Sequence, residues 1–122
     1  MPTILVVDDE PAIAAMVQDL LEDEGYEVVT AGNGQDGLAC LAERRPQLVL
    51  SDVMMPGMDG RAFCRALQAD AAYRAIPVVL MSAVAAPGSR DGCNYAAFVR
   101  KPFDIATLVS TISTVLNGAP RR

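Results

Sequence analysis

Short apolar segments alternate with longer amphipathic segments along this chain. The apolar segments have the composition of β-strands and lie at residues 3–7, 26–30, 47–51, 76–82 and 97–100. The first, third and fourth are apolar almost throughout, which is typical of parallel strands covered on both faces. The second and fifth carry more polar residues, so we expect them at the edges of a sheet.

The segments between the strands carry apolar residues at helical spacing. The apolar stripe of the first predicted helix consists of Ile13, Met16, Val17, Leu20 and Leu21. The stripe of the last consists of Ile105, Leu108, Val109, Ile112 and Leu116. Two further helices are predicted at 33–44 and 58–69. The fourth helical segment, 83–94, contains Pro87, Gly88 and Gly92, which predict at most a short or irregular helix.

Five alternations of strand and helix predict an α/β fold with one doubly wound, five-stranded parallel sheet of order 2-1-3-4-5. The chain has 122 residues, a length that fits one domain. We expect that domain to cover residues 1–118, and residues 119–122 to be a tail or the start of a linker.

Composition narrows the classes of function. The formal net charge of −5 argues against nucleic acid or an anionic membrane as a partner, because phosphate contacts need clustered Lys and Arg. Histidine is absent, which excludes Ser-His-Asp and Cys-His catalysis and histidine metal sites. Cys40, Cys64 and Cys93 show no metal-type spacing, and we expect them to be reduced and mostly buried. With no signal peptide or membrane span visible, the predicted location is the cytoplasm.

Three acidic residues follow predicted strands at the edge where such folds place their sites. Asp8 and Asp9 follow the first strand and Asp52 follows the third, on either side of the topological switch point. Two such charges about 5 Å apart repel by about 3 kcal/mol at an effective dielectric near 20. A hard divalent cation such as Mg²⁺ would relieve this repulsion. The alternative for Asp8 and Asp9 is helix capping, but the third acid favours the metal site.

Two more polar residues end strands at the same edge. Ser82 ends the fourth strand and offers a hydroxyl donor, and Lys101 follows the fifth and can balance a carboxylate or a phosphoryl group. Either residue alone would be an ordinary surface side chain. The convergence of four strand ends on one point predicts a functional site.

The chain resembles a response regulator receiver domain of two-component signalling over about residues 3–117. The segments that carry this resemblance are 7–10 (Val-Asp-Asp-Glu), 52–60 (Asp-Val-Met-Met-Pro-Gly-Met-Asp-Gly), 82–83 (Ser-Ala) and 101–103 (Lys-Pro-Phe). Each is weak alone, but their order and their places at the strand ends make the set specific. The resemblance implies the flavodoxin-like arrangement of the CheY-like superfamily.

The resemblance also implies roles for the site residues. Asp52 would accept a phosphoryl group, and Mg²⁺ would bind Asp8, Asp9, Asp52 and the backbone carbonyl of Met54. Ser82 and Lys101 would contact the phosphoryl oxygens, and the Lys101-Pro102 bond would be cis. Phe98 stands where receivers often carry a switching tyrosine, so it could pack inward or be static core. Met54 offers no polar side chain to position a hydrolytic water, which predicts a long-lived phosphoryl state.

The implied partners are a sensor histidine kinase or histidine phosphotransfer protein as donor and an unidentified output partner. The chain would act on itself and not as an enzyme on external substrates. Its output surface would comprise the fourth helix, the fifth strand and the last helix. Because the stretch from Ser82 to Lys101 is about one helical turn shorter than usual, the usual dimer is in doubt, and we expect a monomer or a weak, phosphorylation-dependent dimer.

Three alternative functions fit the sequence less well than this hypothesis. Residues 32–37 match the GxGxxG dinucleotide pattern, but they follow the second strand and the chain is too short for both Rossmann halves. A haloacid-dehalogenase-type phosphatase needs an acid two residues after the nucleophile, where this chain has Met54. A phosphorylation-independent interaction module would have no need for all of the site residues.

Overall fold

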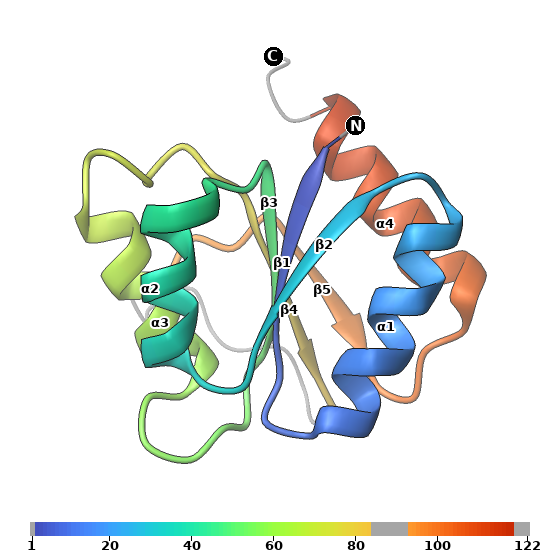
Figure 1. Ribbon diagram of the computed structural model, residues 1–122, viewed down its shortest axis with the longest axis horizontal. Helices are drawn as coiled ribbons and strands as arrows, with labels where there is room; N and C mark the ends of the chain where they lie inside the picture. Colours follow the sequence, from blue (N-terminus) through green and yellow to red (C-terminus); the bar gives the residue numbers. More distant parts are fainter. Residues whose placement is uncertain (1, 84–92, 119–122) are drawn as a thin grey trace.

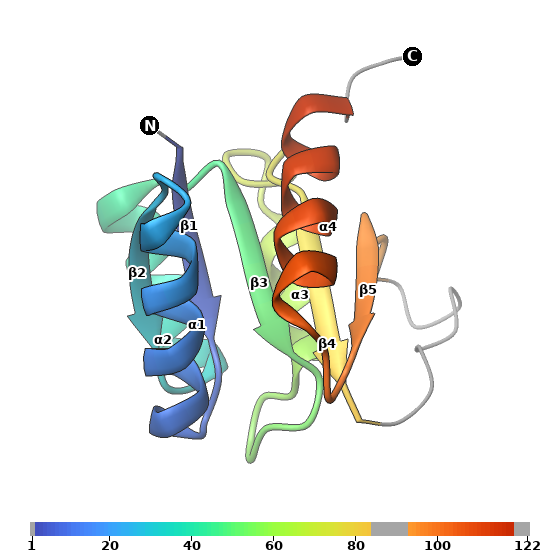
Figure 2. The same ribbon diagram turned by 90° about the vertical axis from the view of Figure 1, so that its right-hand side faces the viewer.

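The computed structural model describes residues 2–83 and 93–118, and within them it confirms the predicted α/β fold. Five parallel strands form one sheet in the order β2-β1-β3-β4-β5 (Figures 1 and 2). The strands are β1 (Thr3–Val7), β2 (Glu27–Ala31), β3 (Leu48–Asp52), β4 (Val78–Ser82) and β5 (Ala97–Arg100). The helices are α1 (Pro11–Asp23), α2 (Gly34–Arg44), α3 (Gly60–Ala69) and α4 (Ile105–Gly118).

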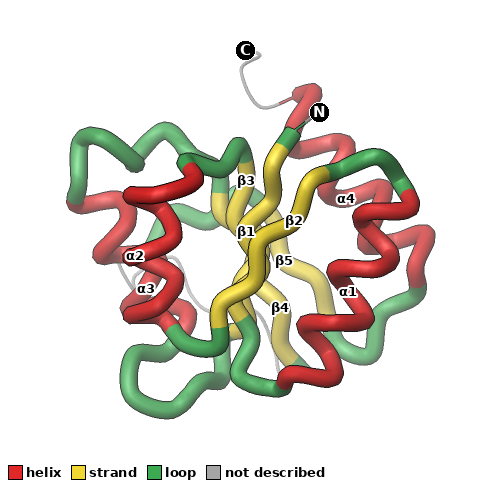
Figure 3. The backbone as a smooth tube through the Cα atoms, in the orientation of Figure 1, coloured by secondary structure: helices red, strands yellow, loops and turns green. Residues whose placement is uncertain are grey.

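Helices cover both faces of the sheet. Figure 3 shows α2 and α3 on one side of the strands, and α1 and α4 on the other. Alternate residues of β1 belong to the two hydrophobic core layers on opposite faces of the sheet. Leu5 and Val7 pack toward α2 and α3, whereas Ile4 and Val6 pack toward α1 and α4. This two-sided burial explains why the central strands are apolar at every position.

Several helix boundaries differ by a residue or two from those predicted. α2 begins at Gly34 because Asn33 is its N-cap, with Oδ1 accepting from the Asp36 amide at 2.7 Å. α3 begins at Gly60 because Asp59 caps it in the same way, accepting from Ala62 at 2.9 Å. Side-chain capping of the free amides sets both starts.

Two residues of the predicted apolar stripes lie outside the core. Met16 on α1 is 43% exposed and Ile105 at the start of α4 is 54% exposed. The buried part of each stripe is therefore narrower than predicted. The fourth helical segment expected at 83–94 falls almost wholly on residues 84–92, outside the described residues. None of the described helices is both long and apolar enough to cross a membrane.

The expectation that the cysteines are all reduced is wrong. Cys64 of α3 forms a disulfide with Cys93, 29 residues later, while Cys40 is free. Next to this bond, Gln68 exchanges two hydrogen bonds of 2.9 Å with the backbone of Asn94. The chain entering β5 is thus tied to α3 by one covalent and two polar contacts.

Reduction of this disulfide should lower the free energy of unfolding by about 3 kcal/mol, because a closed loop of this length restricts the unfolded chain. Urea unfolding with and without dithiothreitol measures the difference. A Cys40→Ser variant should show the same difference, since Cys40 takes no part in the bond. An unchanged midpoint after reduction would contradict a stabilising role for the link.

Candidate functional site

The carboxyl ends of four parallel strands bring polar residues to one edge of the sheet. Asp8 follows β1, Asp52 ends β3, Ser82 ends β4 and Lys101 follows β5. Asp8, Asp52 and Ser82 are each no more than 5% exposed. The predicted convergence of strand ends is therefore present, and it gathers buried polar groups where a ligand can reach them.

Lys101 lies between the two buried carboxylates. Its Nζ donates to Oδ2 of Asp52 at 3.3 Å and to Oδ2 of Asp8 at 3.4 Å. The backbone amide of Lys101 donates to the carbonyl of Ser82 at 2.8 Å, which anchors this residue to the end of β4. The Lys101-Pro102 bond is cis, as the resemblance implied.

The carboxylates are also held by the backbone. Oδ1 of Asp52 accepts from the Met54 amide at 3.3 Å, and Oδ1 of Asp8 accepts from the Glu10 amide at 2.9 Å. Each carboxylate therefore has one oxygen facing Lys101 and the other tied to the loop that follows its own strand.

The electrostatic balance at the site disfavours a charged Asp52. Burial raises the pKa of Asp52, the attraction of Lys101 lowers it, and repulsion from Asp8 raises it again, so that its pKa lies above its ordinary value. For Lys101, burial lowers the pKa, but attraction to Asp52 and Asp8 outweighs it, and the pKa of Lys101 lies above its ordinary value. One ammonium thus only partly compensates two buried carboxylates.

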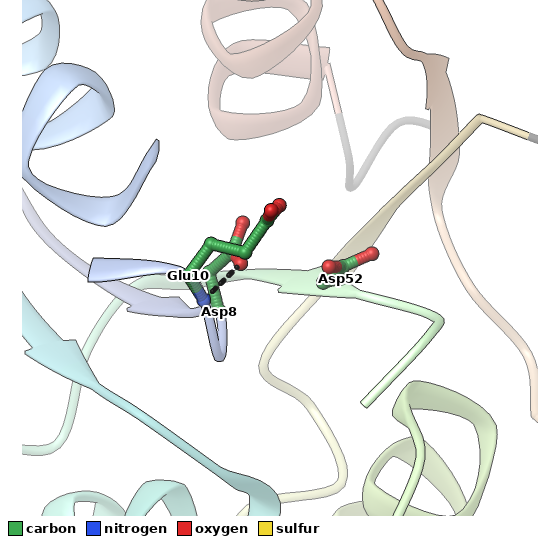
Figure 4. A group of neighbouring side chains, drawn as sticks. All are labelled: Asp8, Glu10 and Asp52. Carbon is green, nitrogen blue, oxygen red and sulfur yellow. Dashed lines mark hydrogen bonds between the residues drawn. The ribbon is translucent and has the colours of Figure 1, made fainter. Parts of the chain in front are cut away.

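A third carboxylate, that of Glu10, lies at this site. Among the described residues, oxygens of Asp8, Glu10 and Asp52 lie within 4.8 Å of one another (Figure 4). The sequence predicts no role for Glu10 at the site, although Glu10 belongs to the segment 7–10 that carries the resemblance. It occupies the N-cap position of α1, but its side chain makes no cap hydrogen bond. An acid two residues after a strand-end aspartate was the signal that could have revealed it.

Asp9, a predicted metal ligand, has an exposed side chain and lies outside that group of three. It nevertheless lines the pocket over the site. This pocket has a volume of about 270 Å³ and is lined by Asp9, Glu10, Asp52, Met54, Ala83 and Lys101. The site is therefore open to an incoming group, and the side chain of Met54 is 62% exposed at its edge.

Phe98 is half-buried on β5. Its ring packs against the core layer on the α2 and α3 side of the sheet. Phe98 and Leu80 are partners in the register of β5 and β4, two residues before Ser82 on β4. An inward-packed aromatic side chain and a buried serine thus lie on adjacent strands near the site.

Packing explains two glycines of the GxGxxG pattern. A Cβ atom on Gly34 would lie 2.8 Å from Sδ of Met58, and one on Gly37 would lie 3.0 Å from Cε1 of Phe63. These glycines let α2 lie close to Met58, in the loop before α3, and to Phe63 of α3. A dinucleotide is not needed to account for them.

Comparison with known proteins agrees with this geometry. The chain matches the family model described as "Response regulator receiver domain" over residues 4–113. The chain belongs to the response regulator receiver family. It is 37% identical over 123 residues to Protein PilH of Pseudomonas aeruginosa, covering 97% of this chain and all of PilH. It is 43% identical over 115 residues to the response regulator PleD of Caulobacter vibrioides, covering 92% of this chain but only 25% of PleD.

Solved receiver structures share the fold. The chemotaxis protein CheY4 of Vibrio cholerae superposes with a TM-score of 0.86 at 34% identity, covering 94% of this chain and 98% of that one. The receiver domain of the sensor histidine kinase PA1611 from Pseudomonas aeruginosa has a TM-score of 0.86 at 25% identity, covering 96% of this chain and 98% of its own. That structure has a magnesium ion coordinated in its active site cleft.

Membership of this family settles the general class of function. Receiver domains are phosphoacceptors of two-component systems, and they interact with histidine kinases or phosphotransfer partners and with output domains. The acidic pocket of Asp8, Glu10 and Asp52 fits a phosphoacceptor site.

Proposed function

We propose that this receiver domain takes a phosphoryl group from a phosphohistidine donor onto Asp52. The observation that carries the proposal is the contact of one ammonium, that of Lys101, with both Asp52 and Asp8 in an open acidic pocket. Asp52 is the last residue of β3, beside the switch point, and its carboxylate both faces Lys101 and lines the pocket.

The chemistry is a displacement at phosphorus. A carboxylate oxygen of Asp52 attacks, the bond from phosphorus to the donor's imidazole nitrogen breaks, and the imidazole leaves with the electron pair and takes a proton from solvent. The result is an acyl phosphate on Asp52. Lys101 is close enough to attract the phosphoryl oxygens, and the Ser82 hydroxyl is proposed to donate to one of them.

The donor set fits Mg²⁺. The clustered carboxylates of Asp8, Glu10 and Asp52 offer the hard oxygen ligands that this cation prefers. We propose that Asp8, Asp9, Asp52 and the carbonyl of Met54 hold it, with Glu10 contributing an additional negative charge. The bound cation would neutralise charge on the transferring group.

The proposed switch begins with the added charge of about −1.5 to −2 on Asp52. Ser82 moves toward the new oxygens, and Phe98 fills the space that it leaves, which alters the surface around β5 and α4. The part of the proposed output surface at 84–92 lies outside the described residues. With the apolar side chain of Met54 at the mouth of the pocket, the phosphoryl group is expected to be long-lived.

The test is incubation with acetyl phosphate and Mg²⁺, followed by the intact mass. We expect one phosphoryl adduct, which EDTA prevents and hydroxylamine removes, as it does from an acyl phosphate. A chain that stays unmodified in Mg²⁺, or an adduct that resists hydroxylamine, would contradict the proposal.

Two alternative functions give different results in the same assay. A Mg²⁺-dependent aspartyl-phosphate phosphatase would turn over an external phosphoester such as p-nitrophenyl phosphate many times per chain. A phosphorylation-independent interaction module would form no adduct. The present proposal expects a single adduct and no sustained turnover.

A further inference from the structure

Gly60, the first residue of α3, packs directly against the backbone that carries Asp52. It is buried, and its amide donates to the carbonyl of Val53 at 2.9 Å. This bond closes the base of the β3–α3 segment, which also contains Met54. The start of α3 therefore touches the strand end from which the Asp52 carboxylate projects.

The approach is too close for any side chain. A Cβ atom on Gly60 would collide with the carbonyl oxygen of Asp52 and would lie 2.8 Å from Cα of Val53. Both obstacles are backbone, so the contact cannot be relieved by turning a side chain. An alanine at this position must push α3 away from β3 or displace the Asp52-Val53 peptide.

Such a displacement would reach the reactive carboxylate. Asp52 is held by Lys101 Nζ and by the Met54 amide, both at 3.3 Å, which is already near the upper limit for a hydrogen bond. A shift of a few tenths of an ångström at the peptide would weaken both contacts. We infer that Gly60 is a positioning residue, whose missing side chain lets α3 fix Asp52 where its carboxylate meets Lys101 and the metal. This inference rests on the proposed function of Asp52.

The chain offers a matched control in Gly34. Gly34 and Gly60 are each the first residue of a helix, and each follows an Asx N-cap that accepts from the amide three residues on. The Cβ of an alanine at Gly34 would instead meet the side chain of Met58, with Sδ at 2.8 Å, Cγ at 2.9 Å and Cβ at 3.1 Å, and a side chain on a loop gives way more easily than the strand-end backbone that Gly60 faces. Gly60→Ala and Gly34→Ala therefore differ mainly in whether backbone or side chain must move.

Three measurements test the inference. These are the rate of phosphorylation by acetyl phosphate against donor concentration, the dissociation constant for Mg²⁺, and the side-chain NMR signal of Lys101, which is the only lysine in the sequence. Gly60→Ala should lower the maximal rate about ten-fold or more, weaken Mg²⁺ binding several-fold and shift the lysine signal. Gly34→Ala should stay within about two-fold of the wild type in rate.

Urea unfolding of each variant separates positioning from stability. If Gly60→Ala is less stable but keeps wild-type rate, Mg²⁺ affinity and lysine signal while folded, the inference is overturned. If the wild type takes up no phosphoryl group, the proposed function fails, and the Mg²⁺ titration and lysine signal still decide whether Gly60 positions Asp52.

A second pair of variants covers the case in which Gly60→Ala does not fold. Asp59→Ala removes the cap of α3 and loosens its first turn, and Asn33→Ala does the same at α2. We expect Asp59→Ala to lower the phosphorylation rate about three-fold and to shift the lysine signal, because the turn against Asp52 frays. Equal effects of the two cap variants would overturn the inference.

Discussion

Asp52→Asn is expected to abolish the phosphoryl adduct that acetyl phosphate and Mg²⁺ produce on the wild type. An amide oxygen is a poor nucleophile toward phosphorus, and Asp52 is the carboxylate that both lines the open pocket and meets Lys101. The loss should be about a thousand-fold or more, as for other removed nucleophiles. Intact mass measures it. Asp19→Asn, which changes an exposed acid on α1, should leave the adduct unaffected.

Asp52→Asn should also be more stable than the wild type at neutral pH in EDTA. Because burial raises the pKa of Asp52 in the folded protein above its ordinary value of 3.8, the folded state disfavours the charged carboxylate. Asp52 therefore lowers the free energy of unfolding at neutral pH, and this penalty disappears as the pH falls through the folded pKa toward 3.8. Asparagine does not titrate, so the variant lacks this pH dependence of stability. Urea unfolding between pH 4 and 7 checks the sign. A variant less stable than the wild type at neutral pH would contradict this account.

Much of the fold could be predicted because burial on both faces leaves a strong pattern. Strands with no polar interruption, such as Leu48–Asp52 up to its last two residues, occur where helices cover both sides of a sheet. The apolar spacing of a helix predicts the degree of burial of each residue less well, since Met16 and Ile105 have the right spacing but are exposed. Helix starts depended on which Asx side chain made the cap, a local choice that spacing alone does not fix.

The disulfide and the close approach of α3 could not be predicted in the same way. Cys64 and Cys93 are 29 residues apart and meet only because the chain returns past α3 on its way into β5. Gly60 looks like any glycine at a helix start until the backbone of Asp52 is placed against it. Both depend on tertiary distances between elements that have no periodic signature.

The candidate site was predictable to the extent that topology dictates it. Parallel strands must end at one edge, so Asp8, Asp52, Ser82 and Lys101 could be assigned to one place from their positions after strands. The direction in which each side chain points within the loop after its strand could not be predicted from these positions. Both Asp9 and Glu10 are exposed and follow the same strand, but only Glu10 belongs to the carboxylate group with Asp8 and Asp52.

Lys101→Met should leave phosphorylation possible but impair the site in two ways. Methionine keeps most of the length of the unbranched lysine side chain but removes the charge that holds Asp8 and Asp52 together. In EDTA at neutral pH the free energy of unfolding should fall by about 3 kcal/mol, because two buried carboxylates lose their partner. The pKa of Asp52 should rise further, since the attraction of Lys101 lowers it in the wild type. Part of the lost stability should return when Mg²⁺ is added, because the cation takes over the compensation.

The second effect of Lys101→Met concerns switching. Phosphorylation of the wild type should shift the amide NMR signals of β5, because Phe98 on this strand is proposed to move and Lys101, which follows the strand, is proposed to contact the new phosphoryl oxygens. In Lys101→Met the adduct should form within about ten-fold of the wild-type rate, since the carboxylate and the metal ligands remain, while the shifts in β5 should be small. Arg100→Met, which removes the same charge from an exposed neighbour on β5, should keep the wild-type stability and the full shifts. Full β5 shifts in phosphorylated Lys101→Met would show that Lys101 only balances charge and that the proposed movement of Ser82 and Phe98 does not need it.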